Sequence, residues 1–286
     1  MSEKAGRLVD IGDTELFVVE RGAGHSLIVL HGGPGLDHHS FGDYLDGLCD
    51  QFRLVLVDQR ANGRSGRPPE ETWTLKQHAQ DVSSLALAMG LDRYSVLGHS
   101  YGAFVALQHA VDFSGEPTHT IVSSGVPGSR FLMSYVDDQL EHFEPEELRQ
   151  QVTDSWAREQ HAQTQEEVAS LLSDQMPFHF ADPYDPRLPE FEARTQGMVY
   201  SPEILRKSSA EEYGGIEVED QLVNIAHPVL VLAGRHDRTC SIEAAEFMAA
   251  NIPDSALIVF EHSAHMTFVE ENEKYLSCVR EFLNES

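Results

Sequence analysis

The stretch that decides the fold is Ser95-Val-Leu-Gly-His-Ser100-Tyr-Gly-Ala-Phe104, which contains the pattern Gly-x-Ser-x-Gly. The apolar residues 94–97 before the pattern are typical of a strand that is buried on both faces. The residues 101–111 after it are rich in Ala, Val and Leu and are typical of a helix. Glycines on both sides of a serine relieve the crowding of a sharp strand-to-helix turn. The pattern therefore predicts that Ser100 is an exposed nucleophile at the end of a strand.

Similar apolar runs recur on both sides of this stretch. Further strands are predicted at residues 26–30, 53–57, 121–124, 228–233 and 256–260, with a hairpin over residues 7–11 and 15–20. Helices are predicted at residues 74–89, 241–251 and 273–283. Strands that alternate with helices form a mostly parallel sheet. We therefore expect an α/β protein in which helices flank a mostly parallel central sheet.

The strand pattern is interrupted in the middle of the chain. From about residue 129 to residue 213 the sequence becomes helical and acidic, with breaks such as Asp182-Pro-Tyr-Asp-Pro186. Open α/β sheets place their sites at the carboxyl ends of the strands, so a helical insertion here is expected to cover that edge. We expect a core of residues 1–128 and 214–286 and a helical cap of residues 129–213.

Composition narrows the classes of partner. The net charge of the 286 residues is −27, which disfavours binding to nucleic acid or to an anionic membrane. No apolar run approaches the roughly 18 residues of a membrane span, and no secretory signal is visible. The three cysteines are scattered and odd in number, which favours reduced thiols in a cytoplasm. We expect a cytoplasmic protein that acts on a small molecule or short peptide; its oligomeric state is not indicated.

A second glycine-rich motif, His31-Gly-Gly-Pro-Gly35, directly follows the apolar run 26–30. Its glycines allow the backbone to approach a ligand closely. The backbone N–H of Gly33 is therefore a candidate donor to a developing oxyanion. The N–H of Tyr101 is the other candidate, because it lies at the amino end of the helix that follows Ser100. His31 itself is interpreted as a structural residue of the loop.

Three motifs together resemble the prolyl iminopeptidase branch of the α/β-hydrolase superfamily: His31-Gly-Gly-Pro-Gly35, Asp58-Gln-Arg-Ala-Asn-Gly-Arg-Ser65 and Gly98-His-Ser-Tyr-Gly102. The resemblance covers residues 8–128 and 220–284, and in the cap it extends only to length and helical character. Family members commonly have Gly-Ser where this chain has Ala61-Asn62, and often Gly in place of His99. The resemblance implies the α/β-hydrolase fold and an aminopeptidase that releases N-terminal residues, preferably proline, from short peptides.

A serine nucleophile needs a general base, and the base needs an orienting carboxylate. In the resembled fold these residues follow the serine in the order acid, then histidine. Asp237 lies in the loop after the predicted strand 228–233, where the acid belongs. Asp254 is a poorer candidate because it precedes its strand. Asp237 is therefore the predicted acid of the triad.

Two histidines, His262 and His265, compete for the role of base in the loop after residues 256–260. In the resembled fold the catalytic histidine follows a small residue and precedes an acidic one by a few positions. His265, after Ala264 and before Glu270, fits this arrangement better than His262. The predicted mechanism is attack by Ser100 on a carbonyl, with His265 as base and an acyl-enzyme as intermediate.

Asp37-His38-His39 is a cluster of residue types that bind metals, but it lacks a second group of ligands at a recognisable spacing. We interpret it as the start of a helix. Neither a metal nor a cofactor is expected.

The substrate is less well defined by the sequence. In the resembled peptidases, acidic side chains near the cap hold the α-amino group of the peptide, which implies that role for Glu211 or Glu212, with Glu212 the better positional match. Arg238, beside the predicted acid, instead favours repulsion of an amino terminus or binding of a carboxylate. Two alternatives therefore stay open: a carboxylesterase, lactonase or amidase for neutral acyl compounds, and a binding protein whose triad is idle.

Overall fold

The structure is a computed structural model that describes residues 6–211 and 215–284. In this part of the chain eight strands form one sheet in the order β1-β2-β4-β3-β5-β6-β7-β8. From β4 to β8 all neighbours are parallel, whereas β2 runs antiparallel to both β1 and β4. The strands are β1 (Arg7–Asp10), β2 (Glu15–Gly22), β3 (His25–Leu30), β4 (Phe52–Asp58), β5 (Tyr94–His99), β6 (Thr120–Ser123), β7 (Val229–Gly234) and β8 (Ser255–Phe260).

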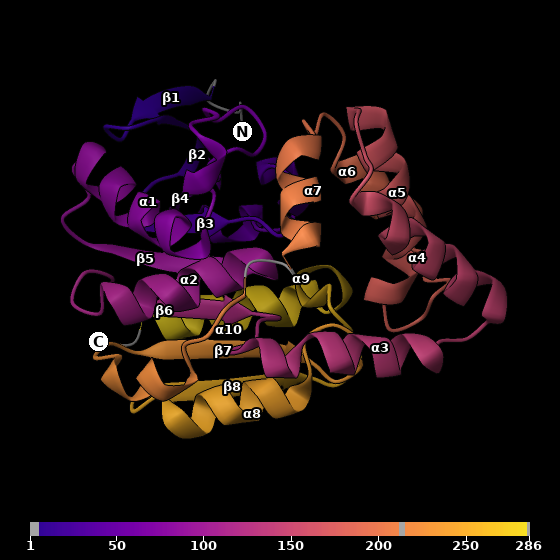
Figure 1. Cartoon of the computed structure of the whole chain (residues 1–286). Helices are drawn as coiled ribbons and strands as arrows, with labels where there is room; N and C mark the ends of the chain where they lie inside the picture. The colour runs from indigo at the N-terminus through magenta and orange to yellow at the C-terminus, as the bar shows by residue number, and fades with distance from the viewer. Residues whose placement is uncertain (1–5, 212–214, 285–286) are drawn as a thin grey trace.

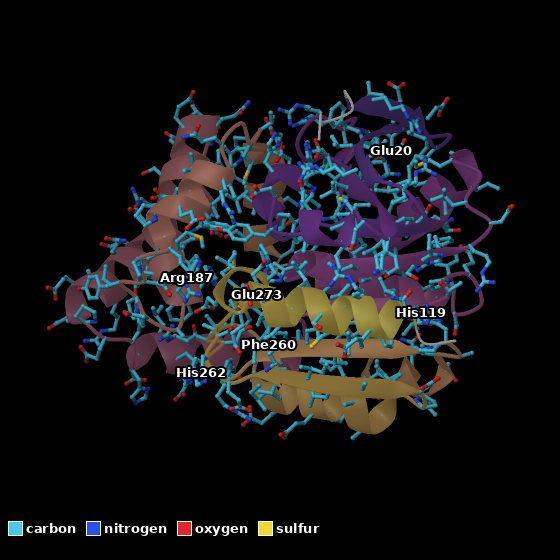
Figure 2. The ribbon with its side chains drawn as sticks, turned by 180° about the vertical axis from the view of Figure 1, so that it is seen from behind. Glu20, His119, Arg187, Phe260, His262 and Glu273 are labelled. Atoms are coloured by element: carbon cyan, nitrogen blue, oxygen red, sulfur yellow. The ribbon has the colours of Figure 1, made fainter. Side chains whose placement is uncertain are left out.

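Helices cover both faces of the sheet (Figure 1). One face packs against α1 (Leu75–Ala88), α2 (Tyr101–Asp112) and α8 (Ile242–Asn251). The other packs against α10 (Asn272–Asn284), which carries Glu273 and crosses the face that Figure 2 shows from behind. The α/β class and the mostly parallel sheet predicted from the sequence are confirmed.

The short apolar runs become strands because most of their residues are buried; the edge strand β8 is only partly covered, with Phe260 buried and Ala256 exposed. Along β3, Ile28 and Leu30 join the core layer under α1 and α2, while Leu27 and Val29 join the layer under α10. Successive side chains of a strand point to opposite faces, so a strand covered on both faces needs apolar residues at every position. This explains why the runs are continuous and do not alternate with polar residues.

Five α-helices of the described chain lie between β6 and β7, and they sit beside the edge of the sheet where the parallel strands end (Figure 1). They are α3 (Met133–Glu141), α4 (Glu146–Glu159), α5 (Gln165–His179), α6 (Leu188–Arg194) and α7 (Pro202–Ala210). We call them the helical insertion. None of the helices in the described residues has the length and apolar character needed to span a membrane.

Candidate active site

Ser100 lies on the sharp turn between β5 and α2, with φ +56° and ψ −122°. A positive φ is unfavourable for a residue with a side chain and is tolerated where the surrounding structure fixes it. The flanking glycines are required by close contacts. A Cβ on Gly98 would lie 1.9 Å from the carbonyl oxygen of Gly102, and a Cβ on Gly102 would lie 2.2 Å from that of Leu30. The turn therefore depends on glycine at both positions of the motif.

Two glycine-rich segments meet at Ser100. A Cβ on Gly32 would lie 3.2 Å from the Cβ of Ser100, so the loop after β3 runs directly beside the serine. Gly33 follows with φ +105°. Tyr101 is the first residue of α2, where a backbone N–H has no acceptor within the helix. Gly33 and Tyr101 line the same cavity as Ser100, as the sequence predicts for two oxyanion donors.

His265 and Asp237 form a buried pair at the ends of the last two strands. Nδ1 of His265 lies 2.9 Å from Oδ2 of Asp237. The other carboxylate oxygen, Oδ1, accepts hydrogen bonds from the N–H groups of Thr239 (2.8 Å) and Cys240 (3.0 Å) and from the Thr239 hydroxyl (2.8 Å). These bonds fix the carboxylate so that its second oxygen faces the histidine. His265, and not His262, is the histidine that the structure brings to the acid and to the cavity.

The electrostatics of the pair favour an ionised acid. Burial alone raises the pKa of Asp237, but the adjacent His265 and the N–H groups of Cys240 and Thr239 outweigh it and lower the pKa to about 2. Two further histidine rings flank His265: His99 with its centroid at 4.9 Å and His179 at 5.1 Å. Burial depresses the pKa of both, for His179 to about 3, so both flanking rings are neutral at pH 7.

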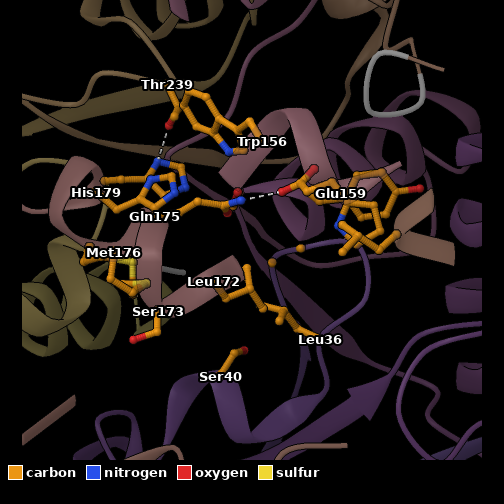
Figure 3. Close-up of a pocket in the computed structure, with 18 of the residues that line it drawn as sticks. Leu36, Ser40, Trp156, Glu159, Leu172, Ser173, Gln175, Met176, His179 and Thr239 are labelled. Carbon is orange, nitrogen blue, oxygen red and sulfur yellow. Dashed lines mark hydrogen bonds between the residues drawn. The ribbon is translucent and has the colours of Figure 1, made fainter. Parts of the chain in front are cut away.

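The serine opens into a cavity of about 730 Å³ between the sheet and the helical insertion. Its floor is formed by residues at the ends of β3, β5, β7 and β8, and its walls by the insertion. Most of the wall is apolar. Trp156, Leu172 and Met176 belong to it (Figure 3), as do Leu132, Val136 and Tyr200. A cavity of this size accommodates a small organic molecule or a short peptide.

One carboxylate is buried in this apolar wall. Glu159, the last residue of α4, is only 2% exposed, and its Oε1 accepts a hydrogen bond of 2.7 Å from Nε2 of Gln175 on α5 (Figure 3). Both residues line the cavity. Sequence reasoning missed Glu159 because it lies among many acidic residues of the insertion. Its only local signal is its helical spacing from Val152 and Ser155, which lie on the same buried face of α4.

Of the two residues predicted to bind an amino group, only Glu211 lies in the described part of the chain, and it is placed away from the cavity. Glu211 pairs with Lys207 at 2.6 Å, its side chain is 55% exposed, and it is not among the described residues that line the cavity. Glu212 lies outside the described residues. Arg238 does not line the cavity either, because its guanidinium donates to backbone carbonyls at the end of α5. The expectation that Arg238 faces the substrate is therefore wrong.

The cluster Asp37-His38-His39 starts a short 3₁₀ helix, as predicted, with Asp37 as its N-cap. Possible metal-ligating atoms of the three residues lie within 4.8 Å of one another. They are, however, engaged within the protein. Nδ1 of His38 lies 2.6 Å from Asp58, and Asp37 binds both His39 and Arg64. These contacts hold the loop after β3 in place.

Comparison with known proteins agrees with this fold. Residues 25–272 match the family model described as alpha/beta hydrolase fold. A proline iminopeptidase of Clostridioides difficile is 31% identical over 90% of this chain and 89% of the relative. Two solved structures share the fold over 98% of this chain: a proline iminopeptidase of Mycobacterium smegmatis (TM-score 0.76, 24% identity, 97% of that chain) and an esterase of Exiguobacterium antarcticum (TM-score 0.77, 23% identity, all of that chain).

The chain therefore belongs to the α/β-hydrolase fold family. Within that family it resembles the proline iminopeptidases, as the three sequence motifs imply.

Proposed function

We propose that the protein is a serine hydrolase in which Ser100, His265 and Asp237 act as nucleophile, base and acid. Support comes from the strained turn at Ser100, the hydrogen bond between His265 and Asp237, and the cavity that Ser100 and His265 share. We propose further that residues 1–128 and 214–286 form the catalytic core and residues 129–213 a cap that shapes the substrate site.

In the proposed reaction His265 takes the proton of the Ser100 hydroxyl as Oγ attacks the carbonyl carbon of the substrate. Asp237 keeps the proton on Nδ1 of the histidine, so that Nε2 is the atom that accepts. The N–H groups of Gly33 and Tyr101 stabilise the tetrahedral oxyanion. His265 then gives its proton to the leaving group, and a water molecule hydrolyses the acyl-enzyme by the same steps.

We propose that the substrate is a short peptide, from which the enzyme releases the N-terminal residue. The observation that carries this is Glu159, a buried carboxylate in the wall of the cavity. An ammonium group close to a carboxylate in a partly dry site is attracted far more strongly than in water. Glu159 thus takes the role that the sequence assigned to Glu211 or Glu212, and the similarity to proline iminopeptidases supports N-terminal proline as the preferred residue.

Hydrolysis of matched substrates tests this proposal. Proline p-nitroanilide is compared with its N-acetylated form, which lacks the amine, and with p-nitrophenyl acetate, p-nitrophenyl butyrate and a lactone. The aminopeptidase is expected to cleave the free amine form and to lose most activity when the amine is acetylated. Turnover of the esters or lactone alone would instead identify an esterase or lactonase.

Variants separate the chemistry from amine binding. Ser100→Ala is expected to abolish all turnover and labelling by a fluorophosphonate. Glu159→Gln is expected to reduce kcat/KM on proline p-nitroanilide by roughly 100-fold, as for the loss of a partly buried charge pair, and to spare the esters. Glu192→Gln is the matched control, because Glu192 lines the same cavity but is exposed.

Equal losses on both substrate types in Glu159→Gln would remove this residue from amine binding. Absence of fluorophosphonate labelling in the unmodified protein would favour a binding protein with an idle triad.

A further inference from the structure

The loop that carries His265 is fastened to the helical insertion. We call residues 261–266, between β8 and α9 (Thr267–Glu270), the histidine loop, and residues 178–181 the α5 exit. The N–H of His265 donates to the carbonyl oxygen of His179 at 3.0 Å. Arg238, beside the triad acid, donates to three carbonyl oxygens of the α5 exit, those of Phe178 (3.0 Å), Phe180 (2.7 Å) and Ala181 (3.1 Å). The base and the insertion therefore share one hydrogen-bonded junction.

Glu270 joins the two sides of this junction through a single side chain. Its Oε1 accepts the N–H of Ala181 in the α5 exit at 2.9 Å. Its Oε2 accepts the N–H of Ala264, the residue just before His265, at 2.8 Å. The carboxylate is 8% exposed, and Arg187 of the insertion donates to the backbone carbonyl of Glu270. One carboxylate thus holds both the histidine loop and the α5 exit.

We propose that Glu270 is a positioning residue whose carboxylate couples the helical insertion to the loop of the base His265. This inference rests on the proposed role of His265. An ionised carboxylate has only acceptors, so each of its oxygens can accept one of the two N–H groups. A protonated carboxyl group carries an O–H on one oxygen, and that oxygen would face an N–H donor. We call the hydrogen bonds from Ala181 and Ala264 to the Glu270 carboxylate the bridge. Protonation therefore weakens one of its two hydrogen bonds.

The charges around Glu270 place this change near neutral pH. Burial raises its pKa to about 7, although the two backbone N–H groups and Arg187 oppose the increase. Asp185, which pairs with Arg187 at 2.5 Å, adds to it. Arg238 faces the carboxylate from the loop after β7, and Glu271 lies next to it on the histidine-loop side. The bridge is therefore complete above pH 7 and weakens as the pH falls below it.

Hydrogen exchange tests the bridge without relying on catalysis. Exchange is measured by mass spectrometry on peptides that contain Ala181 or Ala264, from pH 6 to pH 8, and corrected for the intrinsic rate of exchange. In the unmodified protein, protection of at least one of the two amides is expected to rise by up to roughly tenfold over this range, because a group with a pKa near 7 is about 90% protonated at pH 6. In Glu270→Gln, whose amide accepts only one N–H, that protection is expected to be low at every pH.

Glu271→Gln is the matched control. The Glu271 carboxylate accepts from the His262 N–H at 3.0 Å and from the Ser263 hydroxyl at 2.7 Å. These two bonds hold the histidine loop without a contact to the α5 exit. Its substitution is expected to leave the protection of the Ala181 peptide and the pH dependence unchanged. If Glu270→Gln does not fold, the pH dependence of the unmodified protein decides the question alone.

Kinetics then show whether the bridge serves the reaction. On the best substrate, Glu270→Gln is expected to lower kcat roughly tenfold with little change in KM, as for the loss of one hydrogen bond. The kcat values of the unmodified protein and the variant are expected to differ most at pH 8, where the Glu270 carboxylate is ionised, and to converge as the pH falls below 7. Protection that does not vary with pH, or a variant whose kcat equals that of the unmodified protein at pH 8, would overturn the proposal. If no substrate is hydrolysed at all, the proposed function fails, and the exchange data still decide the bridge.

Discussion

At the scale of single residues, the site depends on how one carboxylate is held. Oδ1 of Asp237 is taken up by Thr239 and Cys240, which leaves Oδ2 to face Nδ1 of His265. The acid therefore keeps its orientation whether or not the histidine is protonated. A carboxylate in this position determines which nitrogen of the histidine carries the proton.

Asp237→Asn changes that tautomer without removing the contacts that hold the side chain. The amide oxygen can still accept from Thr239 and Cys240, so the amide nitrogen faces His265 and donates to it. Nε2 then carries the proton and cannot act as base. We expect kcat to fall by roughly 10⁴-fold with the fold intact, measured by steady-state kinetics and by thermal unfolding. A loss below tenfold would contradict the proposed role of the acid.

Some site residues could be found from the sequence and others could not. Ser100, Gly33 and Asp237 each lie just after an apolar run, and the ends of parallel strands meet at one edge of the sheet. Glu159 and Gln175 face the cavity only because α4 packs on α5 across the strand ends. Nothing in the sequence near either residue specifies that packing. The resemblance pointed instead to Glu211, which lies outside the cavity lining, and to Glu212, whose call stays a prediction.

At the scale of elements, burial explains why the strands could be predicted from the sequence. Continuous apolar runs were sufficient to place β3 through β7, because both faces of those strands are buried, and they also placed the partly exposed edge strand β8. The boundaries differ by one or two residues, as at β5, which includes His99. The helices of the insertion were predicted only as a group, since their amphipathic faces pack mainly on one another and on the cavity.

Gly102→Ala tests the close approach of α2 to β3. A Cβ at this position would lie 2.2 Å from the carbonyl oxygen of Leu30, so the helix must move away from the strand. We expect the free energy of unfolding to fall by about 1–3 kcal/mol, as in an overpacked core, with a large loss of activity. Urea unfolding measures the first effect.

Gly115→Ala is the control for this variant, because nothing lies within 4 Å of a Cβ at that position. Its stability is expected to change by less than about 0.5 kcal/mol. If Gly102→Ala changed the free energy of unfolding as little as Gly115→Ala does, the turn between β5 and α2 would tolerate a side chain at residue 102.

At the scale of the whole molecule, stability is expected to depend on pH through Glu270. Its folded pKa of about 7 lies above its ordinary value of 4.5, so the folded state favours the protonated form. Unfolding moves this carboxyl group into water, so the full stability is present below pH 4.5 and decreases as the pH rises through 7, by up to roughly 3 kcal/mol. The sign is opposite to that of the local hydrogen bonds to Ala181 and Ala264, which are stronger when the carboxyl group is ionised but still buried. The stabilising contribution of Asp237, with its pKa of about 2, is constant over this range.

Urea unfolding of the unmodified protein and of Glu270→Gln at pH 5 and pH 8 measures this contribution. The unmodified protein is expected to lose more stability between the two values than the variant does. The same loss in both proteins would assign the pH dependence to other groups.

The order of the strands in the chain has a consequence for the timing of activity during synthesis. Ser100 follows β5, whereas Asp237 and His265 follow β7 and β8, which are made only after the whole helical insertion. Chains fold from the N-terminal end as they leave the ribosome. A nascent chain thus contains its serine long before Asp237 and His265 are made. If these residues act as proposed, activity is expected only after the last strand has joined the edge of the sheet.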